Sequence, residues 1–427
     1  MKKIIGLLCA AAMTFTVFAA PKTGVDGEMP KTTPFVLDDF EEGMYMIDYF
    51  NMQNYKENNR IEAKLSLGGL PKSLWETYSA FANSLGGVLL LGVEEQKDKS
   101  LHVVNLPAPE QLIAEFKMLL NNPKKVSVNI LSEQDITIED VNGKRIVVIR
   151  VPRAQRYDKP VYIDGDPFTG TYRRNGEGDY RCTKAEVEAM LRDAMVQTPD
   201  MAVLEQMSLD VLDNDTLRRY REHVETLHTG RFTGMDDATF LYQAGAAAYG
   251  VDGLLHPTAA GLLMFGREQA ILAQYPQYLL EYQEQTANGE QWAQRLVSTS
   301  GAWSGNLYDF YIQVQSSLQS GNNIQHLDGS VQLALGEALA NCLMHADYYG
   351  TRGIVILKQQ DRVVFSNPGT FLIDVKKAKK GGISNPRNVA LMKLFHLAGV
   401  GRGTGSGMVQ IYQAWEQQGW QDPIVQE

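Results

Sequence analysis

The chain has 427 residues, of which 44% are hydrophobic and 21% charged, and this composition excludes a disordered chain, a collagen and a disulfide-stapled miniprotein. Its 40 Lys and Arg against 50 Asp and Glu give a formal net charge of −10, so contact with nucleic acid requires a local basic patch. The three cysteines, Cys9, Cys182 and Cys342, are too few and too widely spaced for a zinc cluster or a disulfide framework.

Residues 1–20 have the pattern of a secretory leader. Two lysines precede an apolar run from Ile4 to Ala20, and a polar stretch follows it. The alternatives are an apolar N-terminal helix, or true initiation near Met29 or Met44. No later segment approaches the ~20 uninterrupted apolar residues of a membrane-spanning helix, so we expect no stable membrane span after residue 20.

The segment after the leader predicts an α+β domain. Residues 38–69 are polar and predict helix, and an amphipathic helix is expected over 72–83, ended by two glycines. The apolar run 88–93 predicts a buried strand. Further elements are expected in the order helix 108–120, strands 126–130, 136–139 and 146–151 with an Asn142-Gly143 turn, strands 161–163 and 171–174, and helix 183–194 opened by a Thr183/Glu186 capping box.

The rest of the chain predicts a helical region and then a second α/β part. Residues 196–330 are mostly helical in pattern, with glycine-containing loops. From residue 331 we expect a long helix, strands over 353–358 and 362–366, glycine-rich and basic linkers, and a helix near 407–415.

Polar residues recur at helical spacing in the long helix. Glu337, Asn341 and His345 lie four residues apart, so they share one stripe, where carboxylate and amide oxygens suit a hard cation such as Mg²⁺. The alternative is an ordinary polar helix face. The segment 401–407 has glycine at alternate positions before a helix, and exposed N–H groups there can bind a phosphate. Together these features predict a nucleotide site.

Residues 331–427 resemble the C-terminal ATP-binding part of the RecG-like helicase-related regulators, a divergent branch of the GHKL ATPases. The motifs that carry the resemblance are E-A-L-A-N-C-L-M-H-A-D-Y (N box), S-N-P-G-T-F (strand-end turn), S-N-P-R-N-V-A (lid segment) and G-R-G-T-G-S-G-M (glycine box), in that order. The implied fold is a GHKL-like α/β sandwich, here without its last strands.

The resemblance implies roles for the motif residues, with ATP and Mg²⁺ as cofactors. Asn341 would coordinate Mg²⁺, Glu337 would orient or deprotonate the attacking water, and His345 would belong to the nucleotide site. Asn367 and Gly369 would border the adenine. The residues implied to cover the phosphates are Gly403, Gly405 and Gly407.

The chain departs from the family pattern at two of these motifs. Asn367 stands where GHKL enzymes have an aspartate that reads the adenine amino group; its amide oxygen accepts a hydrogen bond but carries no charge. Ala346 stands where most relatives carry an arginine, which removes a cation from the edge of the site.

Residues 50–195 resemble the Schlafen/AlbA-like domain. The matching segments are E-N-N-R-I-E-A-K, S-A-F-A-N-S-L-G-G, V-L-L-L-G-V-E-E, P-V-Y and Y-R-R-N-G, in that order and spacing. The resemblance implies nucleic-acid binding, with DNA as the expected partner. Lys64, Arg173 and Arg174 suit phosphate and Tyr172 suits base stacking, the alternative for the two arginines being a solvated strand end.

An alternative function of this domain is metal-dependent nuclease chemistry. Glu57 and Glu62 reproduce the glutamate pair of animal Schlafen relatives, and Glu94 or Glu95 would supply a third acid. Glu62 and Lys64 also form an E-x-K pattern that bacterial relatives keep without known cleavage, which favours a structural ion pair.

We therefore expect four parts: a leader-like segment 1–20, a Schlafen/AlbA-like domain 38–195, a helical connection 196–330 and a GHKL-like domain 331–427. The leading hypothesis is an ATP-binding, nucleic-acid-binding transcriptional regulator without a helicase motor, because the chain has no P-loop. The alternatives are the nuclease and an exported interaction protein with degenerate sites. The family resemblance favours a cytoplasmic location, whereas residues 1–20 favour export. The sequence leaves open whether the protein hydrolyses ATP weakly with Mg²⁺ and whether it forms an oligomer.

Overall fold

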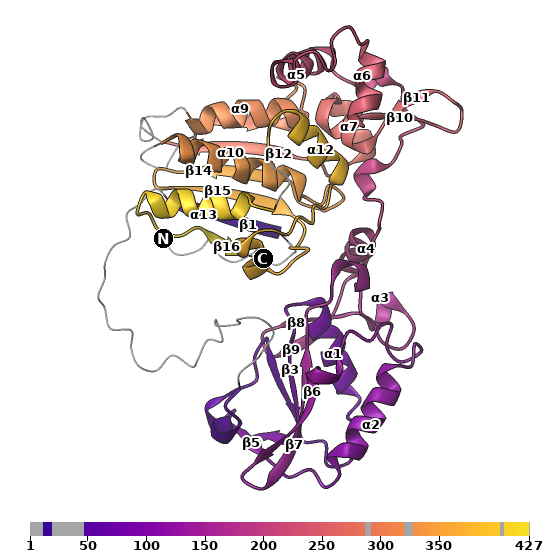
Figure 1. Ribbon diagram of the computed structural model, residues 1–427, viewed down its shortest axis with the longest axis vertical. Helices are drawn as coiled ribbons and strands as arrows, with labels where there is room; N and C mark the ends of the chain where they lie inside the picture. The colour runs from indigo at the N-terminus through magenta and orange to yellow at the C-terminus, as the bar shows by residue number, and fades with distance from the viewer. Residues whose placement is uncertain (1–11, 19–46, 287–291, 320–327, 402–404, 427) are drawn as a thin grey trace. The chain divides into compact units, whose positions relative to one another are not determined.

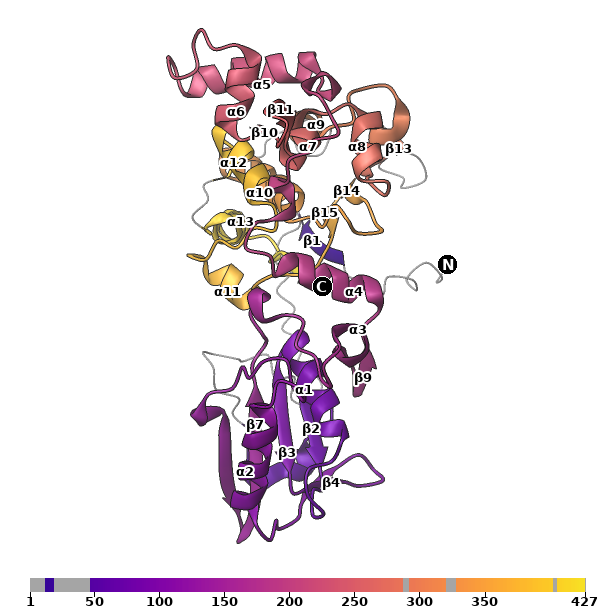
Figure 2. The ribbon, with the colours of Figure 1, turned by 90° about the vertical axis from the view of Figure 1, so that its right-hand side faces the viewer.

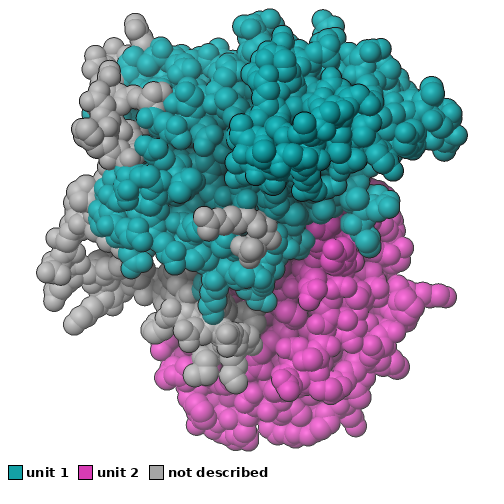
Figure 3. Space-filling model, turned by 45° about the horizontal axis from the view of Figure 1, so that its top comes forward, with its two compact units in different colours: residues 1–24, 195–427 teal, residues 25–194 magenta. Residues whose placement is uncertain are grey.

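The computed structural model describes residues 12–18, 47–286, 292–319, 328–401 and 405–426. It divides into two compact units, residues 25–194 and residues 1–24 with 195–427 (Figure 3). Both units mix helices and sheets, as the sequence predicts. None of the helices in the described ranges combines the length and apolar character that a membrane crossing needs.

The unit of residues 25–194 is built on a four-stranded sheet (Figure 2). One of its two inner strands, β3 (Gly87–Leu91), is buried on both faces. Leu89 and Leu91 pack against the two main helices, whereas Val88 and Leu90 face a second core on the other side. The sheet order is β2 (Ile61–Lys64), β3 (Gly87–Leu91), β7 (Lys144–Val151), β6 (Ile136–Val141), with β2 and β3 parallel, and the helices are α1 (Ser73–Asn83) and α2 (Pro109–Leu120).

Smaller elements complete this unit. Thr183 and Glu186 form the predicted capping box at the start of its last helix. These elements are the 3-10 helices η1 (Tyr49–Asn54), η2 (Glu133–Asp135) and η3 (Arg156–Asp158), the strand pairs β4 (Val93–Glu95) with β5 (Leu101–Val103) and β8 (Tyr172–Asn175) with β9 (Gly178–Arg181), and the helices α3 (Pro167–Gly170) and α4 (Lys184–Asp193).

Most local predictions for this unit are confirmed, including helices α1 and α2 and the turn at Asn142-Gly143, where both residues have positive φ. The helix expected over 38–69 is wrong within the described residues, because 61–64 pair in parallel with β3, a long-range contact that overrides local propensity. The strand expected over 126–130 is also wrong, since only Val126 forms a bridge there.

The second unit contains a six-stranded mixed sheet (Figure 1). Residues Ala12–Phe18, within the leader-like segment, form strand β1 of this sheet. Two further strands come from the region expected to be mostly helical. The strand order is β13 (Trp292–Val297), β12 (Leu280–Gln285), β14 (Ile354–Lys358), β15 (Arg362–Pro368), β1, β16 (Ile424–Gln426).

Helices cover one face of this sheet. Helices α9 (Leu307–Gln319), α10 (Gly329–Met344) and α13 (Gly407–Gln417) lie over it (Figure 1). Val17 and Phe365 point into the shared core. The remaining elements are α5 (Asn214–Leu227), α6 (Asp237–Ala244), α7 (Ala259–Phe265), α8 (Glu268–Gln274), α11 (Val375–Lys380), α12 (Val389–Leu397), strands β10 (Ala247–Tyr249) and β11 (Leu255–Pro257), and 3-10 helices η4 (Pro199–Met201), η5 (Leu209–Val211) and η6 (Ser298–Ser300).

Candidate functional site

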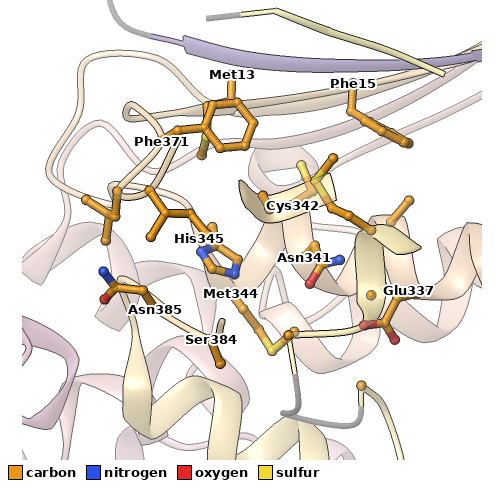
Figure 4. A pocket seen from close by; sticks show the side chains of 18 of the residues that line it. Met13, Phe15, Glu337, Asn341, Cys342, Met344, His345, Phe371, Ser384 and Asn385 are labelled. Atoms are coloured by element: carbon orange, nitrogen blue, oxygen red, sulfur yellow. The ribbon is translucent and has the colours of Figure 1, made fainter. Parts of the chain in front are cut away.

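Helix α10 presents a polar stripe to a cavity of about 160 Å³ in the second unit (Figure 4). Glu337, Asn341 and His345 follow one another at successive turns and line the cavity. Leucines at 335, 339 and 343 are buried in the core, so the apolar side of the helix fixes the direction of its polar side. The predicted stripe therefore exists and borders a partly open cavity.

The opposite wall of the cavity is the sheet. Met13 and Phe15 of β1 point into the cavity from across α10 (Figure 4). Phe365 and Asn367 of β15 also line it, and the expected role of Asn367 beside an adenine stays a prediction. Most of the other lining side chains are apolar, which makes this wall suited to a flat, weakly polar group.

The glycine box reaches the polar stripe at the start of α13. A Cβ atom on Gly407 would lie 2.5 Å from Glu337 Oε1 and 2.9 Å from Asn341 Nδ2, so this contact requires glycine. Gly405 has a φ of +68° and packs against the backbone of Ile383. Both glycines line the cavity, whereas Gly403 lies outside the described residues.

The C-terminal end of α10 is fastened by the S-N-P-R-N segment. The Arg387 guanidinium donates to the carbonyl of His345 and to that of Thr370, the latter at 2.8 Å. The Asn388 side chain donates to the carbonyls of Met344 and Ala346 at 3.0 and 2.8 Å. These bonds satisfy helix-end carbonyls, so the segment acts as an anchor for the site.

Gly369 does not line the cavity in the way that the motif resemblance implies. A Cβ atom on Gly369 would lie 2.3 Å from Arg387 Nη1, so this glycine makes room for the arginine. Several lining residues were not expected from the sequence, and among them Met13 and Phe15 were missed because their segment has the pattern of a leader. Ser384 and Asn385 also line the cavity, and the lid motif was their signal in the sequence.

The electrostatics of the cavity differ from those of an open phosphate site. Of the lining residues in the described part of the chain, none is a lysine or an arginine. Burial lowers the pKa of His345 to about 4, with the Arg387 charge adding to the effect, so the imidazole is neutral at pH 7. A nucleoside triphosphate in this cavity would therefore need a cation and backbone N–H groups to balance its charge.

The residues present fit a magnesium ion only if water and nucleotide phosphates supply most of its ligands. Among the described residues, no group of three or more His, Cys, Asp and Glu side chains could hold a metal. Mg²⁺ commonly keeps several waters and substrate phosphates, with only one or two protein ligands. Asn341, beside Gly407, could supply one such oxygen.

In the first unit, Arg174 is the centre of a buried ion-pair cluster. Its side chain is 1% exposed and pairs with Glu62 at 2.7 Å and with Asp179 at 2.9 Å. Lys64 occupies the second oxygen of Glu62 at 2.5 Å. Arg174 also donates to the Asn58 carbonyl. Glu62 and Arg174 therefore hold β2 and β8 together and leave little free for a phosphate or a metal.

The remaining candidate residues of this unit lie around that cluster. Glu57 accepts from the Ala63 amide at 3.0 Å, and burial, with Glu62 and Glu95 nearby, raises its pKa. Glu94 is exposed and accepts a hydrogen bond from the Gln96 side chain. Because the charge of Glu95 helps to raise the pKa of Glu57, Glu95 rather than Glu94 is the acid beside Glu57 and Glu62.

Tyr172, expected to stack on a base, and Arg173, expected to contact phosphate, differ in exposure. Tyr172 is buried against α1, and its hydroxyl approaches Glu76 at 3.4 Å. Arg173 pairs with Glu186 at 2.9 Å, and its side chain is 42% exposed. Of the four residues that the sequence singled out for nucleic acid, Arg173 therefore offers the most surface.

Family models match three successive parts of the chain. Residues 57–183 match "Schlafen, AlbA_2", residues 188–281 match a domain of unknown function (DUF8451), and residues 352–427 match "Putative ATP-dependent DNA helicase recG C-terminal". No curated protein matches the chain.

Two solved structures are similar to parts of the chain. The N-terminal domain of a putative ATP-dependent DNA helicase RecG-related protein from Nitrosomonas europaea is 32% identical, covering 32% of this chain and 95% of that one, with a TM-score of 0.26. The DIP2311 protein from Corynebacterium diphtheriae is 19% identical over 83% of this chain, with a TM-score of 0.40, and the chain spans 60% of its length.

The chain therefore belongs to the proteins that join a Schlafen AlbA_2 domain to a RecG-like C-terminal domain, with the DUF8451 region between them.

The buried cluster predicts unequal effects of two neighbouring arginines. Arg174→Ala in the full chain should lower the free energy of unfolding by roughly 3–5 kcal/mol, because Glu62 and Asp179 lose a buried counterion. Arg173→Ala should cost at most about 1 kcal/mol, since its pair with Glu186 is half-exposed. Urea unfolding followed by circular dichroism measures both, and equal losses would contradict a structural role for Arg174.

The buried imidazole predicts a pH dependence. An unfolded chain protonates His345 as the pH falls through ~6.5, but the folded chain does so only near 4. Stability present above pH 6.5 is therefore lost on acidification, by up to roughly 2 kcal/mol at pH 5. His345→Asn should flatten this slope in urea titrations at several pH values. An unchanged slope in His345→Asn would rule out the neutral buried state.

Proposed function

We propose that the protein is an ATP-binding, nucleic-acid-binding regulator, with its nucleotide site in the cavity beside α10. The proposal rests chiefly on one observation: the Glu337 and Asn341 side chains lie so close to the glycine box that a Cβ atom on Gly407 would come within 2.5 and 2.9 Å of them. The match of residues 352–427 to the RecG C-terminal model supports the same assignment.

The two walls of the cavity suit the two ends of a nucleotide. The side lined by Met13, Phe15 and Phe365 would pack against the base, because apolar and aromatic side chains stack on its faces. The glycine segment at 405–407 would direct N–H groups toward the phosphates.

The polar stripe would act on the phosphate end. Asn341 would offer its amide oxygen to Mg²⁺, which when bound would neutralise phosphate charge that no lysine or arginine among the described lining residues balances. Glu337 would hold a water by hydrogen bonding, the arrangement needed for weak hydrolysis. Neutral His345 would contribute a hydrogen bond without adding charge.

The nucleic-acid part of the proposal rests on the first unit. Residues 57–183 match the Schlafen AlbA_2 model, a family usually regarded as nucleic-acid-binding. Arg173 is the best-exposed cation among the residues singled out, so contact with DNA would involve it before the buried Arg174.

We expect Asn341→Ala to weaken Mg-ATP binding by on the order of tenfold or more, because it removes a metal-facing oxygen. Leu333→Ala is the matched control, since Leu333 lies on the same helix with 71% of its surface exposed. Isothermal titration of the full chain with Mg-ATP, and with ATP plus EDTA, measures the affinities. Absence of Mg-ATP binding at millimolar nucleotide, together with no effect of Asn341→Ala, would refute the proposal.

A further inference from the structure

Strand β1 is an interior strand of the second unit. It pairs antiparallel with β15 over seven residues, from Ala12 opposite Pro368 to Phe18 opposite Arg362. On its other side, Thr14, Phe15 and Thr16 pair with β16. Neighbouring strands lie ~4.8 Å apart, so β15 and β16 are held at about twice that spacing and do not pair with each other. Without β1, a slot would open in the sheet.

Side chains of β1 alternate between the two faces of the sheet. Met13, Phe15 and Val17 share the face that carries Phe365 and the helices, and the Phe15 and Phe365 ring centroids are 6.4 Å apart. Thr16 is opposite Val364 and faces the other way.

The inward side chains form the cavity wall that faces α10. Met13 and Phe15 point toward Asn341 and His345 across the cavity (Figure 4). Buried Cys342 lines the same space. The cavity is therefore lined by residues from the two ends of the chain, about 330 positions apart in the sequence.

We propose that residues 12–18 are a ligand-binding element of this cavity, and that removing them switches the site off. Met13 and Phe15 contact the planar, weakly polar part of the ligand, because a thioether and an aromatic ring both pack favourably against such a face. This inference rests on the proposed nucleotide function, and it adds that β1 forms the part of the wall that contacts the base.

The same strand lies in the apolar run that has leader character. Cleavage at Ala20 would separate residues 12–18 from the rest of the chain. Processing of this kind would therefore convert a closed, binding form into an open form without the site. Because the slot between β15 and β16 accepts an extended segment, the detached strand supplied as a peptide should restore the wall.

The first test measures Mg-ATP affinity by titration calorimetry in four chains: the full chain, the chain lacking residues 1–20, Phe15→Ala and Thr16→Ala. We expect about tenfold or greater weakening in the truncated chain and a clear loss in Phe15→Ala, with Thr16→Ala unchanged. A synthetic peptide of residues 10–20 should restore binding to the truncated chain. Equal affinities in the full chain and in Phe15→Ala would overturn the proposal, and this comparison stands even if the truncated chain fails to fold.

A second readout is independent of nucleotide. In a Cys9→Ser, Cys182→Ser background, Cys342 is the one remaining cysteine of three. Its reaction with a thiol reagent should be slow in the full chain, about tenfold or more faster after Phe15→Pro, which breaks the β1 ladder, and unchanged in Thr16→Ala. An equal rate in the full chain and in Phe15→Pro would contradict the proposal that β1 forms a wall of the cavity. A faster rate without Mg-ATP binding by any chain would instead reject the nucleotide function and keep β1 as the wall.

Discussion

The cavity of the second unit depends on the close approach of α13 to α10. The first residue of α13 is Gly407, and any side chain there would collide with Glu337 and Asn341. The absence of a Cβ lets the beginning of one helix reach the polar stripe of another. The first backbone N–H groups of a helix have no intrahelical acceptor, so they can donate hydrogen bonds to an anion. The contact at Gly407 therefore brings such N–H groups close to side chains that could bind a cation.

A second constraint fixes the end of α10 that carries the polar stripe. Arg387 and Asn388 donate hydrogen bonds to the carbonyls at the end of α10, which holds His345 at the cavity. Burial, together with the Arg387 charge, lowers the pKa of His345 and keeps its imidazole neutral. The cavity therefore has rigid backbone supports and no lining lysine or arginine among the described residues. Binding of the proposed nucleotide would therefore rely on Mg²⁺ and on backbone N–H groups to balance the phosphate charge.

Local patterns predicted what helical geometry determines, and failed where distant strands pair. The spacing of Glu337, Asn341 and His345 was sufficient to place them on one stripe, and the structure brings all three to the cavity. The strand at 12–18 could not be predicted from its own residues, because an apolar run of this length suits a leader equally well. Its partner, β15, lies about 350 residues away. The buried state of Arg174 likewise depends on contacts with Glu62 and Asp179 that no local pattern reveals.

The most direct test of the nucleotide site is photolabelling of the full chain with 8-azido-ATP and Mg²⁺, followed by mapping of the labelled peptides. The label should fall within residues 12–18, 337–345 or 365–373, and excess unlabelled Mg-ATP should prevent it. Label confined to residues 47–194, or label that unlabelled Mg-ATP does not reduce, would contradict a nucleotide site beside α10.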